Sequence, residues 1–189
     1  MPTGTRHTEN QLSFGMRKRT KPRILITGSP GSGKSTLMAK LIKDVHPRRI
    51  AGLSTPEIRR NGIRKGFKMI DLASGKEELL ASTSGSGPTV GKYHVNVAGV
   101  DEILQRIEAS LGAADFVFID EVGKMELLSK NFETFIEHVF SLDKPVIAVV
   151  HRNYVSRYRS KGNVFVLTRN GFEQVRNSIL AELTAATGV

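Results

Sequence analysis

Apolar and polar residues alternate along most of the chain in two regular patterns. Short apolar runs at 23–27, 116–119, 146–150 and 164–167 are interleaved with stretches at helical spacing at 34–45, 100–111, 132–140 and 172–183. The short runs predict buried strands, and the helical spacing predicts amphipathic helices. Strands that alternate with such helices favour a mostly parallel sheet covered by helices on both faces. The pattern therefore predicts a three-layer α/β fold.

Residues 50–97 show a different pattern. Short β-rich runs at 50–54, 57–59, 63–71, 77–82 and 93–97 are separated by Gly, Asn and Ser. Asn61-Gly62 between two of these runs is a strong hairpin signal, because a tight two-residue turn needs positive φ at both positions. We expect an antiparallel β insertion at about 50–97. The Ser- and Gly-rich stretch 82–91 predicts a mobile loop within it.

Length and charge indicate one domain behind a basic leader. A chain of 189 residues suits a single compact unit, here 23–189, since one hydrophobic core usually serves a protein of this size. Residues 1–22 are polar and lack apolar periodicity, which predicts a disordered leader. Residues 1–23 carry six basic residues and one acidic residue. Their net charge of +5 is half of the formal charge of +10 of the whole chain. The other half of the net charge is distributed over residues 24–189 at low density, which favours anionic small molecules over nucleic acid as partners.

The chain has no cysteine, which excludes disulfides, thiol catalysis and cysteine-ligated metal. No window approaches the ~20 apolar residues that a membrane span requires, and the N-terminus lacks the apolar core of a secretory signal. We therefore expect a cytoplasmic protein without membrane partners. The oligomeric state stays open.

The turn after the first strand predicts a phosphate-binding loop. It matches G-x-x-x-x-G-K-[ST] followed by Thr, in the residues Gly28, Ser29, Pro30, Gly31, Ser32, Gly33, Lys34, Ser35 and Thr36. Glycines let backbone N–H groups turn inward around phosphates, and the following helix N-terminus adds partial positive charge. Lys34 would contact the β- and γ-phosphates, and the Ser35 hydroxyl would ligate Mg²⁺. Nucleoside triphosphates are the expected partners, with Mg²⁺ as cofactor.

A second apolar run ends in two acids. Phe116, Val117, Phe118 and Ile119 lead into Asp120 and Glu121. Charges are rarely carried into a buried strand end without a partner, which favours a Walker-B site over simple helix capping. Asp120 would hold Mg²⁺ opposite Ser35, and Glu121 would orient or deprotonate the attacking water.

An acid directly after the Walker-B aspartate is typical of P-loop ATPases in which another strand separates the two motif strands. The strand Val146–Val150 is the expected separator, so that His151 and Arg152 would emerge close to the γ-phosphate. A sensing role and simple solvation both remain open for these two residues.

With these motifs in place, the chain resembles the nucleoside-triphosphate phosphatase family first recognised in thermophiles, which also includes the human cancer-related nucleoside-triphosphatase. The resemblance runs from about Arg23 to Leu183. It rests on Ile26–Thr36, on Gly52, Thr55, Glu57, Ile58 and Arg59, on Gly62, Arg64, Gly66 and Phe67, on Gly91-Lys92-Tyr93, on Ile119–Leu127, and on His151-Arg152. The basic leader and Thr168-Arg169-Asn170-Gly171 depart from the family pattern, and the second departure bears on base preference.

The resemblance implies a RecA-like P-loop core and Mg²⁺-dependent, broad-specificity hydrolysis of ATP, GTP and other triphosphates to diphosphates. It also implies two nucleotide-binding octapeptides, Gly28–Ser35 and Phe116–Gly123. The second adds Val122 and Gly123 to the candidate site residues. Arg59, Glu57 and Arg64 would either reach the phosphates or be solvated, and Lys124 and Glu126 would form salt bridges or assist the site.

Two rival functions stay open. A small-molecule kinase would need an acceptor pocket and a basic lid, for which the stretch 154–161 with Arg157, Arg159 and Lys161 is the candidate. A nucleic-acid-associated NTPase would use the basic leader, but that leader offers only Phe14 for stacking on bases. Because Glu121 suits activation of water, hydrolysis is favoured over both.

Overall fold

The computed structural model describes residues 21–46 and 48–188, so the predicted leader lies outside the described residues except for its last two positions. The strands are β1 (Arg23–Gly28), β2 (Ile50–Ser54), β3 (Glu57–Arg60), β4 (Ile63–Asp71), β5 (Glu77–Ser82), β6 (Thr89–Val90), β7 (Tyr93–Val95), β8 (Phe116–Val122), β9 (Val146–Val150) and β10 (Asn163–Leu167). The α-helices are α1 (Lys34–Asp44), α2 (Val97–Leu111), α3 (Lys130–Ser141), α4 (Val155–Tyr158) and α5 (Phe172–Thr187), with 3₁₀ turns at Glu126–Leu128, Arg152–Tyr154 and Arg159–Lys161.

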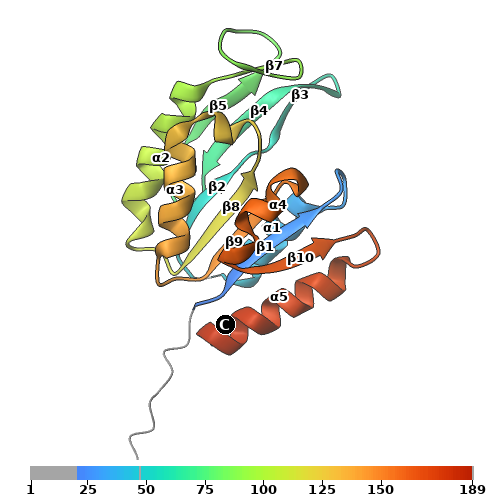
Figure 1. Cartoon of the computed structure of the whole chain (residues 1–189), viewed down its shortest axis with the longest axis vertical. Coiled ribbons are helices and arrows are strands. Elements are labelled where there is room, and N and C mark those ends of the chain that lie inside the picture. The colour runs from blue at the N-terminus through green and yellow to red at the C-terminus, as the bar shows by residue number, and fades with distance from the viewer. Residues whose placement is uncertain (1–20, 47, 189) are drawn as a thin grey trace, which may run out of the picture.

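The centre of the molecule is a parallel sheet in the order β10-β1-β9-β8-β2 (Figure 1). This confirms the predicted α/β class. The strand β9 lies between β1, which leads into the phosphate loop, and β8, which ends in the two acids. The predicted separator strand is therefore confirmed. Because all five strands run the same way, their carboxyl ends and the loops that follow meet at one edge of the sheet.

Helices cover both faces of this sheet. One core contains buried residues of α2 and α3, and the other contains buried residues of α1 and α5 (Figure 1). The strand β8 contributes to both, since Val117 and Ile119 point into the first core and Phe116 and Phe118 into the second. A strand buried on both faces reads as a continuous apolar run, which is why 116–119 looked like one.

The predicted insertion begins later than expected. Its first run, β2, pairs parallel with β8 and belongs to the central sheet. The antiparallel part begins with β3, which pairs with β4, and continues through the neighbours β4-β5-β7-β6. We call the segment from β3 to β7 the insertion. It extends the same sheet beyond β2, because Leu53 and Ser54 of β2 pair antiparallel with Asp71 and Ile70 of β4.

The end of the insertion was also misplaced. A strand was expected to run to Val97 and the next helix to become regular from Val100, but β7 ends at Val95 and α2 begins at Val97. Asn96 is the reason, since its side chain accepts a hydrogen bond from Gly99 N (3.1 Å) and caps the helix. The predicted loop 82–91 also contains the short strand β6, which pairs with β7.

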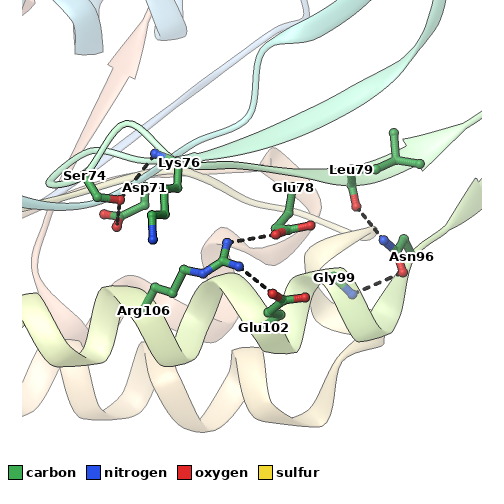
Figure 2. Close-up of polar contacts among 9 residues, drawn as sticks. All are labelled: Asp71, Ser74, Lys76, Glu78, Leu79, Asn96, Gly99, Glu102 and Arg106. Atoms are coloured by element: carbon green, nitrogen blue, oxygen red, sulfur yellow. Dashed lines mark hydrogen bonds and ion pairs between the residues drawn. The ribbon is translucent and has the colours of Figure 1, made fainter.

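Side chains of α2 and of its N-cap residue Asn96 hold the insertion against the core (Figure 2). The Asn96 amide donates to the carbonyl of Leu79 on β5 (3.1 Å), and the Arg106 guanidinium contacts both Glu78 (2.8 Å) and Glu102. The insertion is thus anchored by the helix that follows it. No helix in the described ranges combines the length and the apolar composition that a membrane crossing requires.

Candidate nucleotide site

The phosphate loop links β1 to α1 at the edge where the parallel strands end. Gly33, the residue before α1, has φ of 96°, a left-handed conformation that a side chain would strain. At Gly28, an added Cβ would lie 2.3 Å from the carbonyl oxygen of Leu167 on β10. Both glycines are therefore required by local geometry, as the motif predicted.

Lys34 is the first residue of α1, and its side chain folds back over the loop. The Lys34 Nζ donates to the carbonyl oxygens of Gly28 (3.1 Å) and Ser29 (3.2 Å). Carbonyl oxygens leave the ammonium charge uncancelled. Its position at the helix N-terminus then adds to the positive potential for phosphate.

The two acids end β8 on the other side of β9. Asp120 is buried, with 6% of its surface exposed, and burial raises its pKa to about 6. The Ser35 hydroxyl donates a hydrogen bond to the Asp120 carboxylate, which opposes this rise. Burial also raises the pKa of Glu121, while the nearby Lys34 charge lowers it. The structure therefore brings Lys34, Ser35, Asp120 and Glu121 together, although they come from distant segments.

The oxygen ligands fit Mg²⁺. A hydroxyl and a carboxylate in mutual contact match the small number of protein ligands that Mg²⁺ uses when phosphates and water complete its shell. Within the described residues there is no group of three or more His, Asp or Glu side chains that would hold a metal alone. Ser35 and Asp120 would hold the ion, and when bound it would neutralise charge on the phosphates.

Glu126 is a buried acid whose position the sequence did not indicate. It follows Gly123 by one turn and has 4% of its surface exposed. Burial raises its pKa to about 8, although backbone N–H groups of Glu126 and Gly123 hydrogen-bond to it. An added Cβ on Gly123 would lie 2.9 Å from Glu126 Oε2 and 3.0 Å from Glu121 Oε1. Gly123 thus lets the two carboxyl groups approach the same space. The salt bridge expected as one role of Glu126 is wrong, since no cation is among the groups that shift its pKa and the ion pairs of the described residues do not include it.

One cavity of about 490 Å³ joins these groups to the insertion. Its lining residues are Pro30, Gly31, Gly33, Lys34, Ser35, Thr36, Thr55, Glu57, Arg64, Phe67, Leu80, Val90, Asp120, Glu121, Lys124, Met125, Glu126 and His151. The lining thus combines the phosphate loop and the acids with residues of the insertion and with residues 124–126.

Several candidate residues support the cavity without lining it. They are Gly28, Ser29 and Ser32 in the loop, and Phe116, Val117, Phe118, Ile119, Val122 and Gly123 around the acids. The apolar members of the second group are at most 2% exposed, because β8 is covered on both faces. Such residues position Asp120 and Glu121 through packing, and only the two acids of that octapeptide reach the cavity.

Two of the four other basic candidates, His151, Arg152, Arg59 and Arg64, line the cavity, and two lie outside it. His151 lines the cavity, where burial, Arg152 and Lys34 lower its pKa, whereas Arg152 is exposed and outside it. Arg64 also lines the cavity. Arg59 does not, because its guanidinium contacts Glu57 Oε2 (2.8 Å) and the carbonyl of Gly62 (2.8 Å) at the hairpin.

The comparison with family models agrees with this geometry. A family model described as "NTPase" matches residues 23–183. The chain belongs to this NTPase family. The expected resemblance is thereby confirmed over the whole range that the motifs covered.

Two relatives of this NTPase-family chain share a name. A protein named nucleoside-triphosphatase THEP1 from Methanosarcina acetivorans is 40% identical over 164 residues, which cover 83% of this chain and 94% of the relative. A protein of the same name from Methanocaldococcus jannaschii is 39% identical over 168 residues, covering 85% and 99%. The match spans nearly the full length of both relatives.

Solved structures agree on the fold. The crystal structure of THEP1 from Aquifex aeolicus superposes with a TM-score of 0.71 at 31% identity, covering 85% of this chain and 98% of that one. The solution structure of a human cancer-related nucleoside triphosphatase gives a TM-score of 0.70 at 24% identity, covering 87% and 98%. The second likeness supports the fold alone. Both agree with the predicted P-loop α/β class.

The cavity lining contains residues for which the sequence gave no functional signal. Leu80 and Val90 were not candidates, and Phe67 and Met125 entered only as parts of family strings. The sequence predicted a β-rich run at 77–82, but such a run does not tell whether Leu80 meets other side chains or lines a cavity.

Proposed function

We propose that this chain hydrolyses nucleoside triphosphates to diphosphates and phosphate, with Mg²⁺ and with broad choice of base. The observation that carries the proposal is the convergence of Lys34, Ser35, Asp120 and Glu121 on one cavity. The names of the curated relatives point the same way.

The roles follow from position. Lys34 would leave the carbonyls of Gly28 and Ser29 for the β- and γ-phosphates, since a phosphate oxygen offers a full opposing charge. Glu121 would accept the proton of a water that attacks the γ-phosphorus, and burial supports this role by raising its basicity. His151 completes the wall of the same space.

The segment Thr168–Gly171, which departs from the family pattern, is not part of the cavity lining, but Arg169 Nη2 lies 3.9 Å from a Cβ added to Gly31 of the phosphate loop. The broad choice of base therefore rests on the family resemblance, and phosphate release from ATP, GTP, CTP and UTP tests it.

The kinase reading loses its proposed lid. Arg157 pairs with Glu133 and Lys161 with Glu137, both on α3, and Tyr158 is 1% exposed. None of these residues lines the cavity. The nucleic-acid reading depends on the leader, of which 1–20 lie outside the described residues.

The two acids provide the test of the proposal. Glu121→Gln keeps the size and an acceptor oxygen but removes the base, so nucleotide affinity should survive while single-turnover hydrolysis falls about 10²-fold or more. Asp120→Asn should instead weaken the Mg²⁺-dependent part of binding. Nucleotide affinity and single-turnover rates across Mg²⁺ concentrations measure both effects. Parent-like hydrolysis by Glu121→Gln, or the opposite pattern of metal dependence, would reject the assigned roles.

A further inference from the structure

Glu126 is a buried acid in the wall of the cavity. Only 4% of its surface is exposed, and it lines the same space as Asp120 and Glu121. It begins the 3₁₀ turn that follows β8, and the backbone N–H groups of Gly123 and of Glu126 itself donate to its carboxyl group. An acid is seldom buried this far without a cation, so its place beside the candidate base indicates a part in the chemistry.

The charged surroundings of Glu126 keep it neutral. The other titratable residues of the cavity lining are Lys34 on α1, Glu57 and Arg64 in the insertion, Asp120 and Glu121 on β8, Lys124, and His151 after β9. On the side of α2, Asp101 accepts a hydrogen bond from Ser129 at the end of the same 3₁₀ turn. Burial raises the pKa of Glu126 to about 8, the charges of Glu121 and Asp120 act in the same direction, and no cation among the described residues is a cause that lowers it.

The carboxyl groups of Glu126 and Glu121 meet beside Gly123. A Cβ added to Gly123 would lie 2.9 Å from Glu126 Oε2 and 3.0 Å from Glu121 Oε1, so both oxygens border the place of one carbon atom. Two like charges this close in a buried site disfavour each other, and one of the groups keeps a proton. Glu126 is buried and Glu121 only partly so, which places the proton on Glu126 and the charge on Glu121.

We propose that Glu126 is a positioning residue for the hydrolysis, which donates a hydrogen bond to the Glu121 carboxylate and keeps it directed at the attacking water. The inference rests on the base role of Glu121 proposed above. The proton of the water would pass to Glu121, while Glu126 would keep its own proton and touch neither the phosphates nor the water. Its contribution would be the orientation of the base, because a hydrogen bond to a charged group is stronger than one between neutral groups.

Two substitutions of Glu126 separate this hydrogen bond from packing. Glu126→Gln keeps the size, an acceptor for the backbone N–H groups and a neutral donor, so kcat should stay within about threefold of the parent value. Glu126→Leu removes the donor, so kcat should fall about tenfold or more while KM stays the same. A loss in Glu126→Gln as large as in Glu121→Gln, or a parent-like kcat in Glu126→Leu, would overturn the proposal.

The pH dependence adds a readout that packing alone would not change. The parent chain should lose hydrolysis as the pH rises through about 8, because Glu126 then ionises and repels Glu121. Glu126→Gln cannot ionise and should keep its rate above that pH. In the Glu121→Gln background, Glu126→Leu should cost no further activity, since its effect passes through Glu121. The same alkaline loss in both chains, or a further tenfold loss in the double variant, would contradict the assigned role.

Two glycines give a matched pair of variants in which both acids remain. The methyl group of Gly123→Ala would separate the two carboxyl groups, and its nearest neighbours are flexible side-chain atoms, so the chain should fold. Hydrolysis should fall about tenfold or more at unchanged nucleotide affinity. Gly112→Ala, at the end of α2 where an added Cβ has no neighbour within 4 Å, should keep the parent rate. A parent-like rate in Gly123→Ala would overturn the proposal, whereas a parent-like rate in Glu121→Gln would reject the base role itself.

Discussion

The parallel half of the sheet and the insertion contribute to the same cavity in different ways. The parallel half supplies Lys34 from the start of α1, and Asp120 and Glu121 from the end of β8, a strand that is packed between helices on both faces. The insertion supplies Arg64, Glu57 and Phe67 from an antiparallel hairpin in which the first two are exposed. The candidate catalytic residues thus come from the parallel half, and the insertion contributes other residues of the cavity lining.

The pKa values of the acids also differ between the parallel half and the insertion. Burial dominates at Asp120 and Glu126 and raises their pKa values. At Glu57, burial would raise the pKa, but hydrogen bonds and charges from Arg64 and Arg59 outweigh it and lower the pKa. A buried acid is ready to exchange a proton near neutral pH, whereas a paired exposed acid stays charged and has a structural part. The comparison therefore supports the parallel half as the place of the proposed proton transfer.

The largest effect is expected on stability, where packing is densest. Phe118→Ala should lower the free energy of unfolding by about 3–5 kcal/mol, because it empties a site that is 0% exposed between α1 and the sheet. Ile63→Ala, at a hairpin position 57% exposed, should change it by no more than about 0.5 kcal/mol. Denaturant unfolding measures both. Equal losses would contradict the contrast between the two halves.

The next effect concerns the phosphate loop. Lys34→Ala should reduce hydrolysis on the order of 10²- to 10³-fold and weaken triphosphate binding, since a charge aimed at the reacting phosphates is lost. Lys43→Ala is the matched control on the same helix, because Lys43 is exposed in its last turn and outside the cavity. Steady-state rates and nucleotide titrations measure the difference. Parent-like hydrolysis by Lys34→Ala would remove the loop from the mechanism.

The smallest effect separates the two arginines of the insertion. Arg64→Ala should slow hydrolysis by about fivefold at most, because an ion pair that is largely exposed is worth about 1 kcal/mol or less. Arg59→Ala should lower kcat/KM by less, since Arg59 lies outside the cavity and its partner Glu57 keeps the ion pair with Arg64. A larger loss for Arg59→Ala than for Arg64→Ala would mean that the tip reaches the phosphates during turnover.

Much of the fold could be predicted from local pattern. The motif glycines, the lysine and the apolar runs have one physical meaning wherever they occur, so the strand, loop and helix around Gly33 and the buried strand before Asp120 followed directly. The place of Val146–Val150 between the motif strands was predicted from the acid that follows Asp120, and the strand pairing confirms it. The β-rich pattern also indicated an insertion, though not its first strand.

Both bounds of the predicted insertion were wrong for the same reason, because they depend on contacts with residues distant in the chain. A run such as Ile50–Ser54 has the same pattern whether its partner is parallel or antiparallel, and only its hydrogen bonds with Phe116–Asp120 decided that it belongs to the central sheet. Asn96 likewise fits a strand end or a helix cap until its contacts with Gly99 and Leu79 are known.

The phosphate loop and the pair of acids were predictable from the sequence, because both motifs depend on residue type and local spacing. The other residues that line the cavity became known only from the fold. Leu80 of β5, Val90 of β6 and the pair Met125-Glu126 come together in that lining from three segments that are distant in the chain. An apolar residue on the inner face of a strand has the same sequence pattern whether it meets another side chain or an open space. The folded arrangement alone distinguishes a core from a site.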